Sequence, residues 1–277
     1  MPNNYYAEKI VLVTGGGSGI GRELCLKLAK AGATIICTDI DPDSAALTIS
    51  LIEDTTKGVA GKLDVTQLAE FENVIEEAIT KYGRLDLIFN NAGIAISGEI
   101  RDITADEWKK VMDVNFFGVI NGSQTAYRYM LKQGFGQIVN IASAAGLIDY
   151  LALMAPYSVS KHAVVNYTKI LRTEAKKLGI KANVVCPGFI GTSIGTNAIV
   201  ANARQSWNDH AIEMVAKGIS VDKAAGCILQ GVAKNKEIIV FPFEARIIYL
   251  VTRLFKGLFR KAMQKQVKDF RANYRVS

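Results

Sequence analysis

The sequence predicts an α/β protein: a doubly wound parallel sheet with helices on both faces, in a single domain. Short apolar runs rich in β-branched residues recur along the chain, and helical patterns separate them. Strands that are apolar throughout are typical of a parallel sheet covered on both faces. The expected strands are residues 10–13, 34–39, 59–63, 85–90, 136–143, 181–188 and 237–242.

Length and composition fit this fold class. A chain of 277 residues with 49% hydrophobic residues can bury a large core, and no repeat or proline-rich linker divides it. The four cysteines include no CxxC pair and there are two histidines, so we expect no metal, reduced thiols and a cytoplasmic protein. We also expect no secretory signal and no membrane-spanning helix, because no apolar stretch reaches about 18 residues.

The first expected strand leads into a glycine-rich turn, TGGGSGIG (14–21), and then into a helical pattern over 22–33. Glycines let the backbone approach a pyrophosphate, and the N-terminus of the next helix offers free N–H groups and a favourable dipole. The key glycines are Gly15, Gly19 and Gly21. The turn therefore predicts a dinucleotide site, and a turn without a ligand is the alternative.

Tyr157 and Lys161 lie four residues apart in the run PYSVSKHA (156–163). In a helix this spacing puts both side chains on one face. The lysine ammonium would stabilise the phenolate and lower the pKa of the tyrosine from about 10, which suits a general acid/base. The spacing alone is weakly specific and gains weight from the motifs that precede it.

With these motifs the chain resembles the short-chain dehydrogenase/reductase family over nearly its whole length. The other matching positions are NNAG (90–93), Asn115, Ser143, and PG followed by a threonine, which are Pro187, Gly188 and Thr192. The resemblance implies a Rossmann-type fold, a nicotinamide cofactor, and hydride transfer between that cofactor and a carbonyl or secondary alcohol carbon.

The resemblance also implies a role for each catalytic position. Tyr157 exchanges the proton with the substrate oxygen, while Lys161 lowers its pKa and bonds the nicotinamide ribose. Ser143 steadies the substrate oxygen as charge develops on it, and Asn115 holds a water that links Lys161 to solvent. The alternatives are a buried serine at a strand end for Ser143 and a helix-kink residue for Asn115.

Asp39 ends the second expected strand and bears on the choice of cofactor. A carboxylate there can accept hydrogen bonds from both ribose hydroxyls of NAD, whereas the 2′-phosphate of NADP would meet a like charge. Ser18, Thr38 and Ile40 supply no compensating cation. We therefore expect NAD; an Asp39 that only caps the next turn is the alternative. By resemblance, the other cofactor positions are Gly15, Ser18, Gly19, Ile20, Gly21, Asp64, Val65, Asn91, Ala92, Gly93, Tyr157, Lys161, Pro187, Gly188, Ile190 and Thr192.

The substrate walls are expected at Ala95, Ile96, the run 146–155 and the stretch after Thr192, with a lid around 190–218. Ala95, Ile96 and most of the run 146–155 are apolar. Apolar walls suit a lipophilic alcohol or ketone such as a steroid, retinoid or fatty alcohol. Two alternatives stay open: an NADP-dependent carbonyl or 3-oxoacyl reductase, and a non-catalytic regulatory protein that binds the cofactor.

The chain divides into a catalytic domain, 1–243, and a basic extension, 244–277. The extension carries nine Lys/Arg and two Asp/Glu, which accounts for the whole net charge of +7. Apolar residues recur at helical spacing over 245–266 beside basic ones, as in an amphipathic helix. This helix either packs on its own protein or a sister subunit, or it attaches the protein to a membrane surface. We expect a homodimer or homotetramer, and no nucleic-acid partner because no recognition motif is present.

Overall fold

The computed structural model describes residues 5–54, 57–191, 199–216 and 218–276. Within these ranges, seven strands form one sheet of parallel neighbours in the order β3-β2-β1-β4-β6-β7-β9. The strands are β1 (Ile10–Thr14), β2 (Thr34–Asp39), β3 (Gly58–Lys62), β4 (Leu87–Asn90), β6 (Gly136–Ile141), β7 (Ile180–Pro187) and β9 (Ile238–Phe241). Every expected strand is present, with ends that differ by at most two residues from the expected ones.

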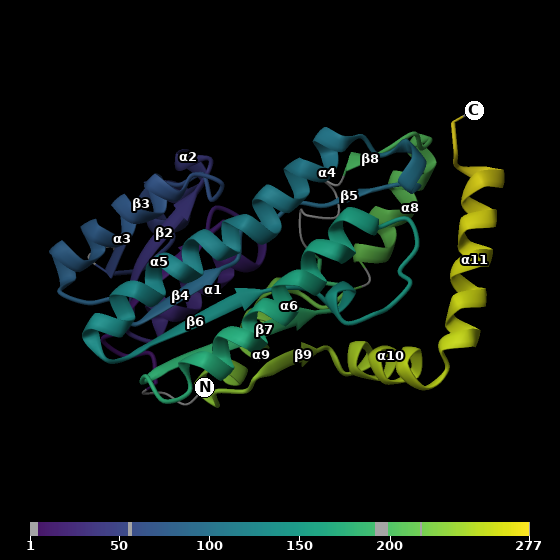
Figure 1. Ribbon diagram of the computed structural model, residues 1–277. Coiled ribbons are helices and arrows are strands. Elements are labelled where there is room, and N and C mark those ends of the chain that lie inside the picture. Colours follow the sequence, from purple (N-terminus) through teal and green to yellow (C-terminus); the bar gives the residue numbers. More distant parts are fainter. Residues whose placement is uncertain (1–4, 55–56, 192–198, 217, 277) are drawn as a thin grey trace.

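Helices cover both faces of the sheet (Figure 1). One face carries α1 (Gly19–Lys30), α2 (Pro42–Ser50) and α9 (Val221–Ala233), and the other carries α3 (Leu68–Tyr82), α5 (Gly118–Gln133) and α6 (Ala155–Ala175). Residues 10–13 of β1 are all apolar because their side chains enter layers on both faces of the sheet. Val11 and Val13 enter the first layer and Leu12 enters the second, because side chains alternate along a strand.

The strand order reverses between β1 and β4, which are neighbours at the centre of the sheet. Ligands of open α/β sheets bind outside the carboxyl ends of the strands at such a switch point. The glycine turn follows β1, and the NNAG run begins at the last residue of β4. Both motifs therefore lie at the carboxyl edge of the sheet.

A small second sheet joins segments that are far apart in the sequence. β5 (Ile96–Ser97) pairs in parallel with β8 (Ile199–Val200), and Ala201 N donates to Ser97 O over 2.9 Å. This sheet was not expected, because two-residue strands carry no hydrophobic pattern. It attaches residues 199–201 to the segment between the NNAG run and α4 (Ala105–Met112).

The C-terminal extension is two helices rather than one. α10 (Phe243–Leu254) and α11 (Lys256–Asn273) are separated at Phe255, whose φ of −118° and ψ of 48° are not helical. α11 turns away from α10 and runs toward α8 (Gln205–Ala216) in the lid (Figure 1). In the part of the chain that the structure describes, no helix is long and apolar enough to cross a membrane.

Candidate active site

The glycine turn is shaped so that only glycine fits at its key positions. Gly15 and Gly19 have φ of 63° and 51°, in the left-handed region that disfavours side chains. A Cβ on Gly21 would lie 2.1 Å from the carbonyl oxygen of Gly15, and a Cβ on Gly15 would lie 2.8 Å from the Cα of Ala92. The turn is therefore closely packed against the residues after β4.

The NNAG run fixes the glycine turn through Asn91 and Thr14. The Nδ2 of Asn91 donates to the carbonyl oxygens of Thr14 and Gly15 over 2.9 and 3.1 Å. The Oγ1 of Thr14 accepts from the backbone N–H groups of Asn91 and Ala92 over 3.0 and 3.1 Å. Asn91 thus has a structural function at the turn. Thr14 contributes to the same contacts, although the sequence indicated it only as the first residue of the glycine motif.

Arg22 and Thr48 hold the other side of the turn, and sequence reasoning missed both. The guanidinium of Arg22 donates to the carbonyl of Gly17, and its Nε donates to the Oγ1 of Thr48 over 3.1 Å. The hydroxyl of Thr48 donates to the carbonyl oxygen of Gly16 over 2.9 Å. Thr48 comes from α2, so only the packing of α2 beside the turn reveals its contribution.

Asp39 lies at the rim of the glycine turn. One carboxylate oxygen accepts from the backbone N–H of Gly17 over 2.9 Å, and the other accepts from Asp41 over 3.2 Å. Both sequence-based interpretations of Asp39 are therefore compatible with its position: it borders the turn, and it caps the segment that leads into α2. Asp41 then caps α2 by accepting from Asp43 over 3.1 Å.

The start of α1 and the turn after β3 carry further residues expected to bind the cofactor. Ser18 is the exposed N-cap residue of α1, and Ile20 lies in its first turn. Asp64 accepts from the backbone N–H and hydroxyl of Thr66 over 3.0 and 2.8 Å. The carbonyl of Val65 accepts from the side chain of Asn121 over 3.1 Å. These contacts fix the backbone at the carboxyl edge of the sheet.

Asn115 is fully buried in a π-helical turn, Asp113–Phe117, between α4 and α5. Its side chain accepts from the N–H of Ile94 over 2.8 Å, and donates to the carbonyl of Ile94 over 2.9 Å and to Ser160 over 3.1 Å. Asn115 therefore does mark a helix irregularity, and it also ties the NNAG segment to α6. Such π-helical turns are frequent at functional sites.

Tyr157, Lys161 and Ser143 meet at the start of α6. Lys161 is 2% exposed; its Nζ donates to the carbonyl of Ile141 over 3.0 Å and lies 5.7 Å from the centre of the Tyr157 ring. A Cβ on Gly93 would lie 3.4 Å from this Nζ. Tyr157 is half-buried and makes a hydrogen bond with Ser143.

The electrostatics of this group differ from the sequence-based expectation. Burial raises the pKa of Tyr157, and the hydrogen bond with Ser143 opposes that shift only in part. Burial also lowers the pKa of Lys161 to about 8. The expected lowering of the tyrosine pKa by Lys161 is absent from this structure, because desolvation dominates and the ammonium is bonded to the Ile141 carbonyl.

The segment after β7 reaches the same edge. Gly188 N donates to the carbonyl of Phe241 over 2.7 Å, which fixes the PG turn that begins at Pro187 against β9. Ile190 is buried and pairs through its backbone with Ile219. Thr192 lies outside the described residues.

The comparisons with known proteins agree with this arrangement. The family model described as short chain dehydrogenase matches residues 9–202. The chain belongs to the short-chain dehydrogenase family. It is 32% identical to SadH of Mycobacterium tuberculosis over 96% of this chain and 97% of that protein. It is 36% identical to the 3-oxoacyl-[acyl-carrier-protein] reductase FabG of Thermotoga maritima, over 72% of this chain and 80% of that one.

Solved structures show the same relationship for this short-chain dehydrogenase. A short chain dehydrogenase/reductase from Burkholderia phymatum, in complex with NAD, superposes with a TM-score of 0.85 at 25% identity. That likeness covers 92% of this chain and 96% of the other. Levodione reductase superposes with a TM-score of 0.75 at 26% identity, over 86% of this chain and 96% of that one.

Near the run expected to form a substrate wall, the structure of this short-chain dehydrogenase has a cavity beside α11 that the sequence did not indicate. Three of the apolar residues expected near the substrate, Leu147, Ile148 and Leu153, are buried. A cavity of about 430 Å³ lies between the loop before α6 and α11. It is lined by Tyr150, Ala152, Arg260, Met263, Gln264, Val267 and Arg271.

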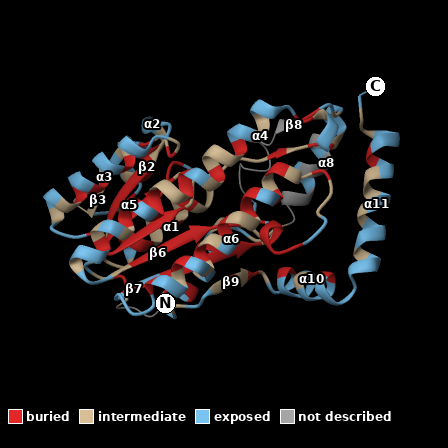
Figure 2. Ribbon diagram, in the orientation of Figure 1, coloured by how far each residue is buried: buried red, intermediate tan, exposed pale blue. Residues whose placement is uncertain are grey.

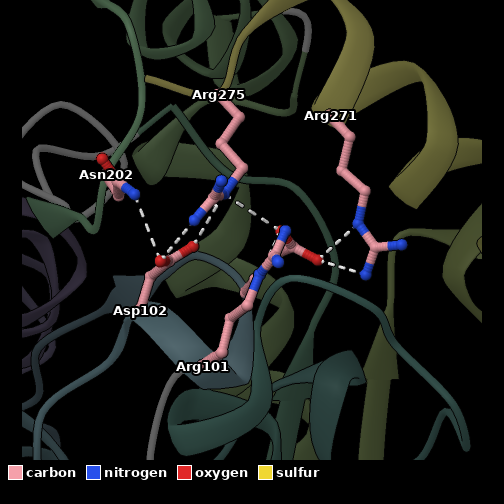
Figure 3. A network of polar contacts seen from close by, with 6 residues as sticks. Arg101, Asp102, Asn202, Arg271 and Arg275 are labelled. Atoms are coloured by element: carbon pink, nitrogen blue, oxygen red, sulfur yellow. Dashed lines mark hydrogen bonds and ion pairs between the residues drawn. The ribbon is translucent and has the colours of Figure 1, made fainter. Parts of the chain in front are cut away.

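An ion-pair network fastens the end of α11 beside the lid (Figure 3). Glu99, 6% exposed, pairs with Arg271 over 2.6 Å and with Arg101 over 2.7 Å. Asp102 pairs with Arg275 over 2.9 Å and accepts from Asn202 over 3.1 Å. The guanidinium groups lower the pKa of both carboxyl groups. The same end of the chain buries Phe270, whose ring lies 5.0 Å from that of Trp207 in α8.

Proposed function

We propose that this chain is an NAD-dependent oxidoreductase that transfers a hydride between nicotinamide and a lipophilic secondary alcohol or ketone. The observation that carries the proposal is the meeting of Tyr157, Ser143 and the buried Lys161 beside Gly93, at the sheet edge where the glycine turn lies. A proton-transfer group, an oxyanion-stabilising hydroxyl and a nucleotide-binding turn together suit this reaction.

The residues present fit a dinucleotide. Because a Cβ on Gly21 would meet the Gly15 carbonyl, glycine there lets the start of α1 pack directly on the turn. A pyrophosphate at this turn would meet the free N–H groups of the helix N-terminus. Asp39 at the rim of the turn would accept hydrogen bonds from the ribose hydroxyls, with Asp64, Val65 and the PG turn further along the edge. When bound, the nicotinamide would supply the hydride acceptor or donor. The NAD complex of the Burkholderia phymatum relative supports this choice.

The protein's own groups would handle the proton. With its pKa raised by burial, Tyr157 is protonated at neutral pH and suits donation to a ketone oxygen. Alcohol oxidation requires Tyr157 to lose that proton, and the ammonium of Lys161, which is charged below about pH 8, would stabilise the phenolate. Ser143 would hold the substrate oxygen during the transfer.

An apolar cluster on the segment after the NNAG run supports the proposed substrate class. Ile96 and Ala201 are buried where β5 and β8 join the lid, and they pack in one apolar cluster with Ile103 and Val111. An apolar surrounding with few polar groups suits a steroid-, retinoid- or fatty-alcohol-like substrate.

A second candidate is an NADP-dependent 3-oxoacyl reductase, favoured by the similarity to the FabG protein of Thermotoga maritima. Asp39 weighs against it, because a 2′-phosphate would face a carboxylate. The nearby guanidinium of Arg22 is bonded to Gly17 and Thr48 and so serves the turn itself.

Absorbance at 340 nm tests the proposal. The purified protein is incubated with lipophilic secondary alcohols, ketones and a 3-oxoacyl thioester, each with NAD(H) and with NADP(H). Turnover of a lipophilic alcohol or ketone with NAD(H) is the expected result. Preference for the thioester with NADPH would establish the second candidate. Tight NAD binding without turnover of any compound would favour a cofactor-binding regulatory protein.

A further inference from the structure

α10 is oriented opposite to the usual arrangement of an amphipathic surface helix. Its small residues Ala245 and Thr252 are 4% exposed and face the protein. Its large apolar residues point outward: Leu250 is 55% exposed and Leu254 is 75% exposed. We name the outward surface the α10 face. It consists of Phe243, Ile247, Ile248, Leu250, Val251, Leu254, Phe255 and Leu258.

Helical geometry gathers most of these residues into one stripe. Residues 243, 247, 250 and 254 follow the spacing of three and four that defines one side of a helix. Figure 2 shows exposed residues along α10 and most of α11. A stripe of this kind normally packs on the protein core. Because this stripe is exposed to solvent, it indicates a surface that binds another molecule.

The inner side of this segment is already packed. Tyr249 lies against the core cluster beneath α6, and Phe259 packs with Ala245 and Ile148. The far end of α11 is fastened by Arg271 to Glu99 and by Phe270 to Trp207. The α10 face is therefore presented by a segment held at both ends, rather than by a tail that could fold back.

The charge beside the α10 face is positive. Between residues 243 and 262 the basic residues are Arg246, Arg253, Lys256, Arg260 and Lys261, all exposed, and the one acidic residue is Glu244. Arg246 and Arg253 are oriented by hydrogen bonds to Val240 O over 2.7 Å and to the Tyr249 hydroxyl over 2.9 Å. Neither bond neutralises the charge.

We propose that the α10 face docks on the surface of an anionic lipid bilayer. The leucines and phenylalanines would enter the boundary between headgroups and acyl chains, and the arginines and lysines would contact lipid phosphates. A second copy of the chain is a poorer occupant. A twofold contact would place the basic residues near their own images with only Glu244 to offset them, and like charges at an interface cost affinity.

Sedimentation with lipid vesicles tests the apolar part of the proposal, without cofactor or substrate. The intact protein should bind vesicles that contain phosphatidylglycerol and bind phosphatidylcholine vesicles weakly. The double variant Leu254→Gln, Leu258→Gln should bind the anionic vesicles at least tenfold more weakly. Its control is Leu47→Gln, Leu51→Gln, in α2 and directly after it, near the opposite edge of the sheet, where the two leucines are 51% and 52% exposed.

A second pair of variants tests whether vesicle binding depends on the basic residues beside the α10 face or on the net charge of the whole protein. Arg253→Gln, Lys256→Gln should lower binding to anionic vesicles roughly thirtyfold at low salt, since each of the two charges near the surface contributes about 1 kcal/mol. Lys176→Gln, Lys177→Gln removes the same charge at the end of α6 and should leave binding nearly unchanged. Equal losses in both variants would overturn the proposal, because attraction would then follow total charge.

Light scattering, which measures the oligomeric state, distinguishes lipid binding from association with a second copy of the chain. The lipid proposal would fail if the intact protein did not bind anionic vesicles and the variant Leu254→Gln, Leu258→Gln converted an oligomer into a monomer. The α10 face would then be a subunit interface. Unchanged oligomeric state together with lost vesicle binding is the result that supports it. Because neither measurement uses turnover, both are independent of the proposed oxidoreductase activity.

Discussion

At the scale of single residues, Tyr157 and Lys161 show how burial competes with charge pairing. The ammonium of Lys161 is buried and bonded to a carbonyl, and its pKa falls to about 8. The same dry surroundings raise the pKa of Tyr157. Groups with shifted pKa values in one small region are typical of catalytic sites, and each shift makes a measurable prediction.

Tyr157→Phe should reduce turnover by about 10²–10⁴-fold, because the hydroxyl serves the proton transfer. NAD affinity, measured by fluorescence titration, should stay nearly unchanged, since the ring remains in place. Tyr129→Phe on α5, a partly buried tyrosine outside the site, is the control and should retain full activity. Substantial turnover in the Tyr157 variant would refute the assigned proton donor.

Lys161→Met should abolish activity and stabilise the fold. A lowered lysine pKa means that the unfolded chain binds this proton more tightly, so burying Lys161 destabilises the protein below about pH 8. The penalty fades as pH rises from about 8 toward the ordinary lysine value. The variant should gain about 1–2 kcal/mol at pH 7, after loss of the bond to Ile141. Urea unfolding at pH 7 and pH 10 measures this; a gain that did not shrink at pH 10 would contradict it.

Asp39→Ala should weaken NAD binding roughly tenfold to a hundredfold, because a charged acceptor of two ribose hydrogen bonds is lost. NADP binding should change less or improve, since a like charge near its phosphate is removed. Isothermal titration with both cofactors measures the difference. A larger loss for NADP than for NAD would show that the preference is wrongly assigned.

At the scale of elements, the glycine turn depends on contacts from several parts of the chain. Asn91 reaches it from the end of β4, Thr48 from α2 and Arg22 from α1. The TGGGSGIG motif predicted the turn itself, because glycine spacing is visible in the sequence. The residues that hold the turn could not be found in that way, since Arg22 and Thr48 are 26 positions apart and only the packing of α2 brings them together.

Gly21→Ala should lower NAD affinity roughly tenfold or more, because strain of this kind costs about 1–3 kcal/mol. The added Cβ would meet the Gly15 carbonyl oxygen at 2.1 Å and displace the turn. Gly226→Ala is the matched control: no atom lies within 4 Å of the Cβ it would add inside α9. That control should bind NAD normally and gain about 0.5–1 kcal/mol in unfolding free energy. Equal NAD binding by both variants would contradict the packing argument.

At the scale of the whole molecule, the last turn of the chain is attached to residues near its middle. Arg275 pairs with Asp102, 173 positions away, and also with Glu99. The backbone of Ala203 pairs with that of Arg275, and the Tyr274 ring lies 5.1 Å from Trp207. The end of the C-terminal extension thus packs on the segment before and within α8 and on the segment before α4.

This attachment should weaken in acid. Arginine neighbours lower the pKa of Glu99 and of Asp102, so their stabilising effect is complete above the ordinary carboxyl values and is lost as pH falls below about 4. In a Trp108→Phe background, which leaves Trp207 as the sole tryptophan, fluorescence should shift to longer wavelength over this range.

Glu99→Gln should produce part of the same fluorescence shift at pH 7, because Arg271 and Arg101 lose a charged acceptor. Asp106→Asn, an exposed carboxylate on α4, is the control and should leave the spectrum unchanged. A Glu99 variant with the parent's spectrum at both pH 7 and pH 4 would show that aromatic packing alone holds α11.

The sequence by itself determined the sheet, the glycine turn and the residues that gather at the sheet edge. Buried parallel strands need apolar residues on both faces, and the turn needs glycine at fixed positions, so both leave local patterns. Only the tertiary structure decided the pairing of β5 with β8, the raised pKa of Tyr157, the break at Phe255 and the outward direction of the α10 stripe. Each of these features depends on desolvation or on contacts between distant segments. The spacing of residues along the sequence does not reveal desolvation or distant contacts.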